Sequence, residues 1–136
     1  MDRLTPTERS ENMRRIRGRD SGPELVVRRL LHMSGYRYRL HRKDLPGRPD
    51  IVFPSRRKVI FVHGCFWHRH RGCKYAYTPK SRTAFWEDKF GQNVQRDARV
   101  EAALSDRGWE TMTVWECETR DASLLLIRLV RFLGGA

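Results

Sequence analysis

The sequence lacks any long hydrophobic run, and its N-terminus lacks the apolar core of a signal peptide. These absences exclude a bilayer-spanning segment, and we expect a soluble, cytoplasmic protein. There is also no internal repeat or low-complexity linker, and 136 residues leave room for little more than one core. We therefore expect one folded domain over residues 21–136, preceded by a basic arm over residues 1–20.

Cysteine and acidic side chains are both scarce. Three cysteines cannot all pair, which argues against a disulfide framework and favours thiols or metal ligands in a reducing compartment. Asp and Glu total 16 against 28 Lys and Arg, so the formal net charge is +12 and the pI is near 10.6. This surplus favours a polyanionic partner, with nucleic acid as the leading candidate. A ribosomal or membrane-surface protein is the competing class.

Histidine and cysteine are concentrated in residues 62–73, which read VHGCFWHRHRGC. Cys65, His70 and Cys73 supply a short group of zinc-type ligands, and Cys117 completes a Cys3His set. With four protein ligands and no open position, such a zinc would be structural and would tie this loop to the segment that carries Cys117. The C-x4-H-x2-C spacing is not a common finger pattern, so incidental thiols are the alternative.

The spacing of apolar residues predicts the order of helices and strands. Ser21-Gly22-Pro23-Glu24 has the form of a capping box and begins a helix that should end at Gly35. Further helices are expected over 83–106 and 124–133, and strands over 36–40, 50–53, 58–62 and 111–117. The long helix carries a candidate buried stripe of Phe85, Trp86, Phe90, Val94 and Leu104. This order predicts an α/β fold with a mixed central sheet flanked by helices.

Acidic and imidazole side chains occur at the ends of two predicted strands. Asp50 opens one strand, where its carboxylate can hold a hard cation or, alternatively, cap a turn. The next strand follows at the distance at which Pro-Asp...(Asp/Glu)-x-Lys nucleases keep a second acid and a lysine, but Phe61 and His63 stand in those places. His63 and His68 are candidate proton-transfer groups.

Several motifs follow one another along the chain, at residues 10–16, 47–50, 59–68, 85–86, 93–97 and 114–117. With them, the chain resembles the very-short-patch repair (Vsr) mismatch endonuclease family over nearly its whole length. The resemblance implies a restriction-endonuclease-like fold. It also implies magnesium-dependent hydrolysis of the phosphodiester 5' of the thymine in a T·G mismatch, the lesion left when 5-methylcytosine deaminates.

The resemblance also implies a magnesium site. Asp50 and the main-chain carbonyl of Val62 match the family's Mg2+ ligands, and Glu24 matches a helix glutamate that acts through a water molecule on the metal. Glu24 has a second interpretation as the partner of Ser21 in the capping box, and both interpretations are compatible.

By the same resemblance, His63 and His68 are the active-site histidines and Asp97 orients the second of them. Asn93 lies one turn before Asp97 on the same helix face and is included among the catalytic candidates. Ordinary helix-surface pairing or solvation is the alternative for both Asp97 and Asn93. His32 and His41 match nothing in the family and are interpreted as structural.

The family's zinc ligands match the Cys3His set proposed above, although Gly72 lengthens the interval before Cys73. Other residues match aromatic and arm positions that contact DNA. Phe66 and Trp67 would intercalate beside the mismatch together with Trp86, which also fits the buried stripe. The arm would contribute wedges into the opposite groove and basic contacts through Met13, Arg14, Arg15 and Ile16.

Our leading hypothesis is therefore a strand-nicking mismatch endonuclease with catalytic Mg2+ and structural Zn2+, acting on double-stranded DNA. We expect a monomer because a mismatch lacks the two-fold symmetry of a palindrome. We also expect a functional link to a cytosine-5 DNA methyltransferase, because deaminated 5-methylcytosine is the expected lesion. A restriction-type or structure-directed nuclease with another target is the second hypothesis, and a non-catalytic zinc-dependent DNA-binding module is the third.

Overall fold

A computed structural model describes residues 21–134, in which four strands form one mixed sheet in the order β1-β2-β3-β4. The strands are β1 (Arg39–Leu40), β2 (Ile51–Phe53), β3 (Lys58–His63) and β4 (Glu110–Trp115). β1 to β3 are antiparallel neighbours, whereas β3 and β4 are parallel. A parallel pair needs a long crossover, and helix α3 (Thr83–Asp106) supplies it. The predicted mixed α/β sheet is confirmed.

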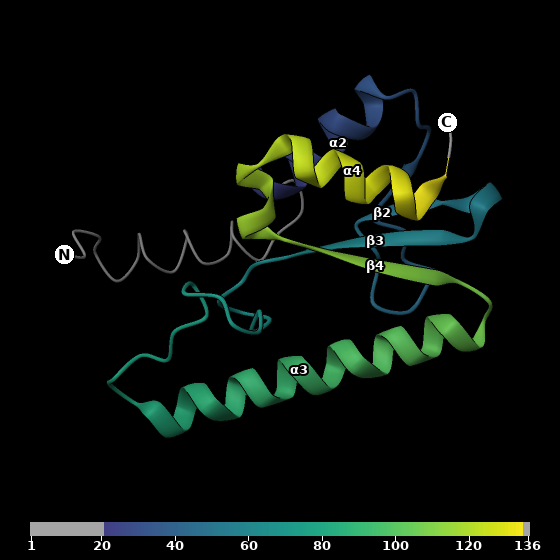
Figure 1. The fold of residues 1–136 in the computed structure, drawn as a ribbon. Coiled ribbons are helices and arrows are strands. Elements are labelled where there is room, and N and C mark those ends of the chain that lie inside the picture. The colour runs from purple at the N-terminus through teal and green to yellow at the C-terminus, as the bar shows by residue number, and fades with distance from the viewer. Residues whose placement is uncertain (1–20, 135–136) are drawn as a thin grey trace.

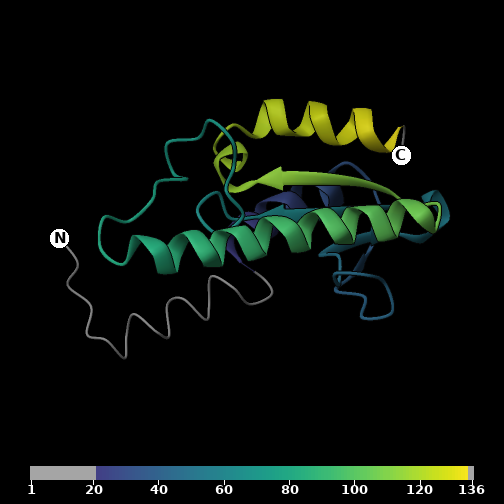
Figure 2. The same cartoon turned by 90° about the horizontal axis from the view of Figure 1, so that it is seen from below.

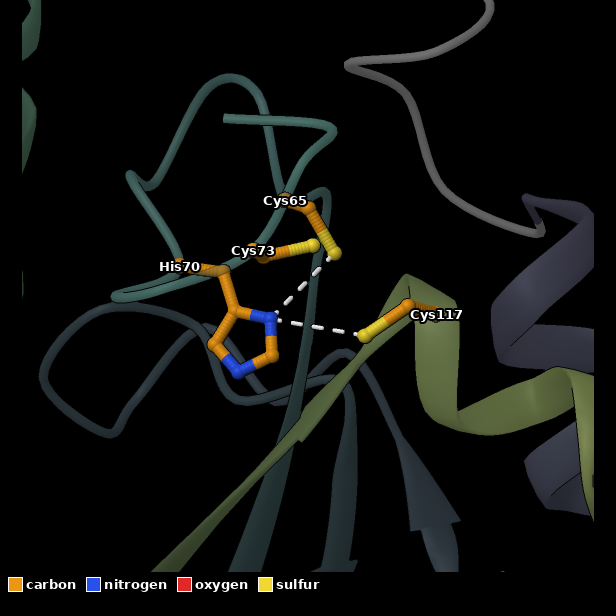
Figure 3. A group of neighbouring side chains, drawn as sticks. All are labelled: Cys65, His70, Cys73 and Cys117. Carbon is orange, nitrogen blue, oxygen red and sulfur yellow. Dashed lines mark hydrogen bonds between the residues drawn. The ribbon is translucent and has the colours of Figure 1, made fainter. Parts of the chain in front are cut away.

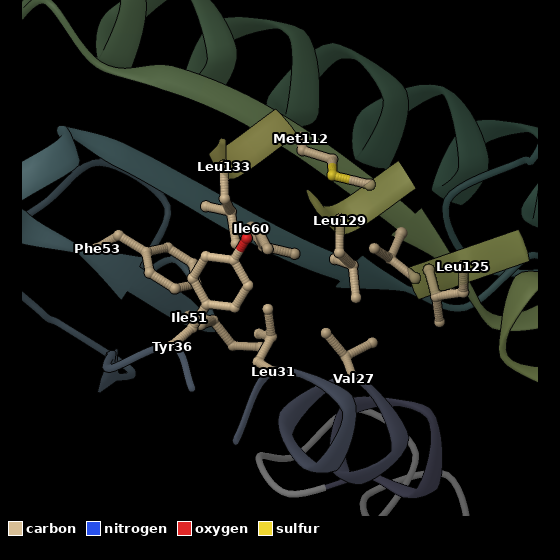
Figure 4. Packing of buried hydrophobic residues seen from close by; sticks show 11 residues of the cluster. Val27, Leu31, Tyr36, Ile51, Phe53, Ile60, Met112, Leu125, Leu129 and Leu133 are labelled. Atoms are coloured by element: carbon tan, nitrogen blue, oxygen red, sulfur yellow. The ribbon is translucent and has the colours of Figure 1, made fainter. Parts of the chain in front are cut away.

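Helices cover both faces of this sheet (Figures 1 and 2). α2 (Gly22–Met33) and α4 (Ala122–Leu133) lie on one face, and α3 lies on the other. Because successive strand residues point to opposite faces, Ile51 and Ile60 pack under α2 and α4 (Figure 4), whereas Val52 and Val59 pack toward α3. The sheet is therefore buried on both sides, and its strand ends are available to carry functional groups.

The predicted start and end of α2 are confirmed. The Ser21 hydroxyl accepts a hydrogen bond of 3.3 Å from the Glu24 amide, which satisfies one of the free N–H groups of the first turn. At the other end, Gly35 has a φ of 85° and the Tyr36 amide donates to the Leu31 carbonyl at 3.0 Å. This cap fixes the position of Glu24 in the first turn of the helix.

Three predicted strands are longer than the observed ones, although the strand expected over 50–53 loses only its first residue. The strand expected over 36–40 is reduced to β1, and the strand expected over 111–117 ends at Trp115. The chain turns there because the Glu118 carboxylate accepts a hydrogen bond of 3.0 Å from the Trp115 amide. A 3-10 helix, η2 (Glu116–Arg120), follows, so Cys117 lies on this turn and not on the strand as expected.

The buried stripe predicted for α3 is wrong in part. Phe90 and Leu104 are buried, but Phe85 and Val94 are 41% and 46% exposed. The first turns of α3 extend beyond the sheet (Figure 2), and there they pack against the loop that follows β3. No helix within residues 21–134 is both long enough and apolar enough to cross a membrane.

Candidate active site and metal centre

The loop between β1 and β2 sets the position of Asp50. Gly47 in this loop has a φ of +73°, and a Cβ atom there would lie 2.4 Å from Cγ1 of Val100 on α3. Only glycine fits between the loop and the helix in this conformation. The buried Leu45 anchors the same loop in the core that includes Leu104. Asp50 is therefore delivered to the start of β2 from a loop held against α3.

The Asp50 carboxylate lies beside the end of β3. Its Oδ2 accepts a hydrogen bond of 2.7 Å from the Val62 amide. Burial raises the pKa of Asp50 to about 6, the Val62 hydrogen bond opposes this rise, and the nearby Glu24 carboxylate adds to it. Two acidic groups that repel each other in a buried place are suited to a divalent cation, which would relieve the repulsion.

Glu24 reaches the same place from α2, and the structure adds a residue that the sequence analysis set aside. Glu24 is only 2% exposed, and its Oε2 lies 3.3 Å from Nη1 of Arg28 and 2.9 Å from Nε2 of His41. Ligand atoms of Glu24, His41 and Asp50 all lie within 4.8 Å of one another. The interpretation of His41 as a merely structural histidine is therefore incomplete, because it contacts a candidate catalytic group.

The register of the hairpin is the signal that could have revealed His41. Arg39 pairs with Val52 and Leu40 pairs with Ile51, so the residue after β1 must lie beside the residue before β2. The His41 amide indeed donates to the Asp50 carbonyl at 3.1 Å.

His63, the last residue of β3, and His68, from the loop that follows, lie together. Their rings stack with a centroid distance of 3.7 Å and an interplanar angle of 7°. Nδ1 of His68 lies 2.7 Å from Oδ2 of Asp97, so α3 holds this imidazole through a charged hydrogen bond. Burial lowers the pKa of His63 to about 4; His68 lowers it further and Asp97 opposes the shift. The residues expected to transfer protons are thus assembled as one group.

Asn93 contacts the loop after β3 at the residue before His68. Its side-chain amide donates to the Trp67 carbonyl at 3.0 Å and its oxygen accepts from Arg96 at 2.7 Å. Asn93 therefore connects α3 to the backbone of the loop after β3, next to His68.

The Cys3His set comes together at the other side of the same loop (Figure 3). Cys65, His70 and Cys73 come from the loop and Cys117 comes from η2. Nδ1 of His70 lies 3.6 Å from Sγ of Cys65 and 3.4 Å from Sγ of Cys117, and the four candidate ligand atoms are within 4.8 Å of one another. Burial raises the pKa of Cys65 to about 12 and also raises that of Cys117. A bound cation would offset this cost, so the set fits a metal ion.

Trp115 lies between the cysteine group and the pair of His63 and His68. Its ring stacks on His70 at 4.3 Å with an interplanar angle of 10° and meets His63 edge-on at 5.6 Å. The loop after β3 therefore directs His70 to the cysteine group and His68 to the group with His63 and Asp97. The Trp115 ring lies between the two groups.

The aromatic residues expected to intercalate into DNA pack against one another. Phe66 lies 5.0 Å from Trp67 and 5.7 Å from Trp86, measured between ring centroids, and Trp67 is only 8% exposed. Contact between the Trp67 ring and a base would require the ring to move. The exposed rings of this region are Tyr77 and Phe85, at 63% and 41%.

Arg69 holds this loop together. Its guanidinium donates to the carbonyls of Ala76 and Tyr77 at 2.8 and 2.9 Å and to the Thr78 hydroxyl at 3.1 Å. It also lies over the Phe90 ring at 3.9 Å from the centroid. The four arm residues expected to contact DNA, Met13, Arg14, Arg15 and Ile16, lie outside the described residues.

Comparison with known proteins identifies relatives of this chain. A family model described as DNA mismatch endonuclease Vsr matches residues 1–74. Type II nicking enzyme V.XorIIP of Xanthomonas oryzae pv. oryzae is 54% identical, over 97% of this chain and 96% of its own length. Type II nicking enzyme V.NmeAIP of Neisseria meningitidis serogroup A is 39% identical, over 97% and 94%. DNA mismatch endonuclease Vsr of Escherichia coli (strain K12) is 46% identical, over 82% and 71%.

These matches, together with the carboxylate and imidazole groups at the end of β3, define a DNA endonuclease of the nicking class. More particularly, the chain belongs to the DNA mismatch endonuclease Vsr family.

Proposed function

We propose that this protein hydrolyses the phosphodiester 5' of the thymine in a T·G mismatch, making the nick that starts repair of deaminated 5-methylcytosine. The named Escherichia coli relative is a mismatch endonuclease and supports this target. We also propose a restriction-endonuclease-like domain over residues 21–136 and a DNA-contacting arm over residues 1–20.

One observation carries the proposal, namely that acids and imidazoles from four segments meet at the end of β3. Asp50 and Glu24 offer carboxylate oxygens, the ligands that hard cations prefer, and the Val62 amide holds Asp50 in place. We assign Mg2+ to Asp50 and the Val62 carbonyl, with Glu24 beside it. When bound, Mg2+ would polarise the scissile phosphate and favour ionisation of water.

The chain's own residues handle the protons. His63 and His68 are assigned as the proton-transfer groups, because His63 directly follows Val62, whose amide binds the Asp50 carboxylate, and the His68 ring stacks on His63. The Asp97 carboxylate holds the His68 ring by its Nδ1 atom, which leaves Nε2 as the atom available to substrate. Asn93 fixes the loop that carries His68.

We assign a structural Zn2+ to Cys65, His70, Cys73 and Cys117. Tetrahedral zinc with Zn–S near 2.3 Å and Zn–N near 2.05 Å implies S to N distances of about 3.6 Å. The separations of His70 Nδ1 from Sγ of Cys65 and of Cys117, 3.6 and 3.4 Å, agree with that value. Such a zinc would join the loop after β3 to η2.

DNA contact is assigned to the basic arm and to the aromatic group of Phe66, Trp67 and Trp86. In this proposal the aromatic rings open toward the mismatch, where weaker stacking lowers the cost of insertion, and Met13 and Ile16 enter from the opposite groove. Arg14 and Arg15 neutralise phosphates. We further propose a monomer and a functional partnership with a cytosine-5 DNA methyltransferase.

The names of two relatives favour a second candidate. Proteins 54% and 39% identical to this chain are called type II nicking enzymes, so a nicking activity with a different DNA target is the alternative.

A nicking assay separates the two candidates. Labelled duplexes that contain T·G, U·G or matched T·A at one position are incubated with the protein and Mg2+. We expect cleavage 5' of the mismatched thymine and an intact matched duplex. Equal cleavage of matched DNA would favour the second candidate, and intact DNA in every reaction would refute the first.

The companion variant is Asp50→Asn, for which we expect a loss of nicking of at least about 100-fold with DNA affinity kept, since a catalytic metal supplies several kcal/mol. Asp44→Asn is the matched control, because Asp44 lies exposed in the same loop, paired with Arg42. Full activity in Asp50→Asn would rule out the assigned metal site.

A further inference from the structure

His41 lies where the β1–β2 hairpin meets α2. Its backbone has a φ of 49°, and its amide is held by the Asp50 carbonyl at 3.1 Å. Its side chain is 13% exposed, and Nε2 lies 2.9 Å from Oε2 of Glu24. Asp50 therefore holds the main chain of His41, and the His41 ring points at Glu24.

Only one of the two groups in this contact can donate the hydrogen bond. A carboxylate oxygen only accepts hydrogen bonds, so the His41 ring must donate through Nε2. Glu24 is almost fully buried and needs such partners to offset the loss of water. Arg28 reaches the same oxygen from one turn along α2, at 3.3 Å, but a residue on the same helix cannot fix Glu24 relative to the sheet. His41 can, because the hairpin positions it.

We propose that His41 is a positioning residue for Glu24. It holds the Glu24 carboxylate toward Asp50 and so connects the helix that carries one acid to the hairpin that carries the other. This inference rests on the proposed function in one respect, which is that Glu24 takes part in the reaction. His41 itself is assigned no contact with DNA or metal.

A double-mutant cycle tests the coupling. The variants are His41→Leu, which removes the donor, His41→Gln, which keeps a donor, Glu24→Gln, and the combination of His41→Leu with Glu24→Gln. His32→Gln is the matched control, because His32 lies exposed at the end of the same helix. The measurements are the single-turnover rate of nicking, the dissociation constant for the duplex and the thermal midpoint.

We expect His41→Leu to slow nicking by about 10- to 100-fold, the usual effect of losing a partner of an active-site group. Duplex affinity should stay within about twofold, and His41→Gln should recover most of the rate. The double variant should be no slower than Glu24→Gln alone, since His41 acts only through Glu24. Two results would overturn the proposal. One is an unchanged nicking rate in His41→Leu. The other is that His41→Leu slows nicking by the same factor in the Glu24→Gln background as in the unchanged protein.

A measurement without DNA distinguishes failure of this inference from failure of the proposed function. In long-range 1H–15N spectra of the whole protein, the His41 ring should show a protonated Nε2 whose proton is downfield and slow to exchange. That signal should change in Glu24→Leu and persist in the His32→Gln control. If it is the same in Glu24→Leu, the contact does not exist and the inference is wrong, whatever the nicking assay shows.

Mn2+ serves as a probe of the cation site in the same variants. For a positioning residue, His41→Leu should weaken Mn2+ binding only when Glu24 is present. Equal weakening in the Glu24→Gln background would make His41 a metal ligand, which contradicts the proposal.

Discussion

At Gly47 the backbone has a φ of +73°, and the α-carbon lies against Val100 of α3. We expect Gly47→Ala to lower the free energy of unfolding by about 2–4 kcal/mol, because left-handed strain and overpacking each cost roughly 1–3 kcal/mol. Urea denaturation measures this loss. Nicking should fall with it, because the same loop delivers Asp50 to the site.

Gly91→Ala is the matched control for this substitution. Gly91 lies on α3 with nothing within 4 Å of an added Cβ atom, so alanine there should raise the free energy of unfolding by about 0.5–1 kcal/mol. Combining Gly47→Ala with Val100→Ala removes the clash between the two side chains. The double variant should therefore recover only that part of the lost free energy of unfolding that the clash causes. Stability equal to that of the unchanged protein in Gly47→Ala would mean that the loop is free to move away from α3.

Individual residues differ in how far the sequence reveals their role. Asp50 is recognisable in the sequence because an acid at the start of an apolar strand is unusual. The cysteines are recognisable because few residue types bind zinc. His41 was set aside because its partner, Glu24, is 17 positions away and only the pairing of β1 with β2 brings them together. A contact that depends on strand register is not visible in local sequence.

At the scale of an element, the loop after β3 depends on the metal that we assign to it. We expect one Zn2+ per chain, released by chelation, and we expect His70→Ala to lose the metal whereas His68→Ala keeps it. The reason is that the loop directs these two imidazoles, two positions apart, to different groups. Zinc content by atomic absorption checks both variants.

Loss of zinc should also lower the thermal midpoint, because the bound metal contributes folding free energy. Within the loop, the hydrogen bonds of Arg69 provide a second constraint, so we expect a lower midpoint and not complete unfolding. Retention of zinc by His70→Ala together with its loss in His68→Ala would reverse the assignment.

Helices and strands were predicted well where a single spacing of apolar residues continued along their whole length. α2 begins and ends as expected because Ser21 caps its start and Gly35 marks its end, and Gly108 marks the end of α3. β4 was predicted too long because the Glu118 side chain, which ends it, acts from beyond the strand. The stripe on α3 failed at Phe85 because the first turns of the helix extend beyond the sheet, a fact that depends on tertiary arrangement and not on helical spacing.

At the scale of the whole molecule, the net charge of +12 has a measurable consequence. We expect the affinity for duplex DNA to fall steeply with salt, with a log–log slope of about −0.9 for each phosphate neutralised. Arg14→Ala should reduce the size of this slope by about 1, and Arg131→Ala, exposed on α4, should leave it unchanged. Fluorescence anisotropy at several salt concentrations measures the slopes. Identical slopes for all three proteins would argue against a phosphate contact by Arg14.

The stacking of His63 on His68 has a consequence for how two metals can coexist in so small a protein. A metal ion bound by imidazole lies in the plane of the ring, and two nearly parallel rings with centroids 3.7 Å apart cannot direct lone pairs at one ion. Although these imidazoles and Asp97 are close enough to form a ligand group, they are therefore poor competitors for zinc. Ring orientation would thus protect the nuclease from poisoning by the metal that its neighbouring thiols attract.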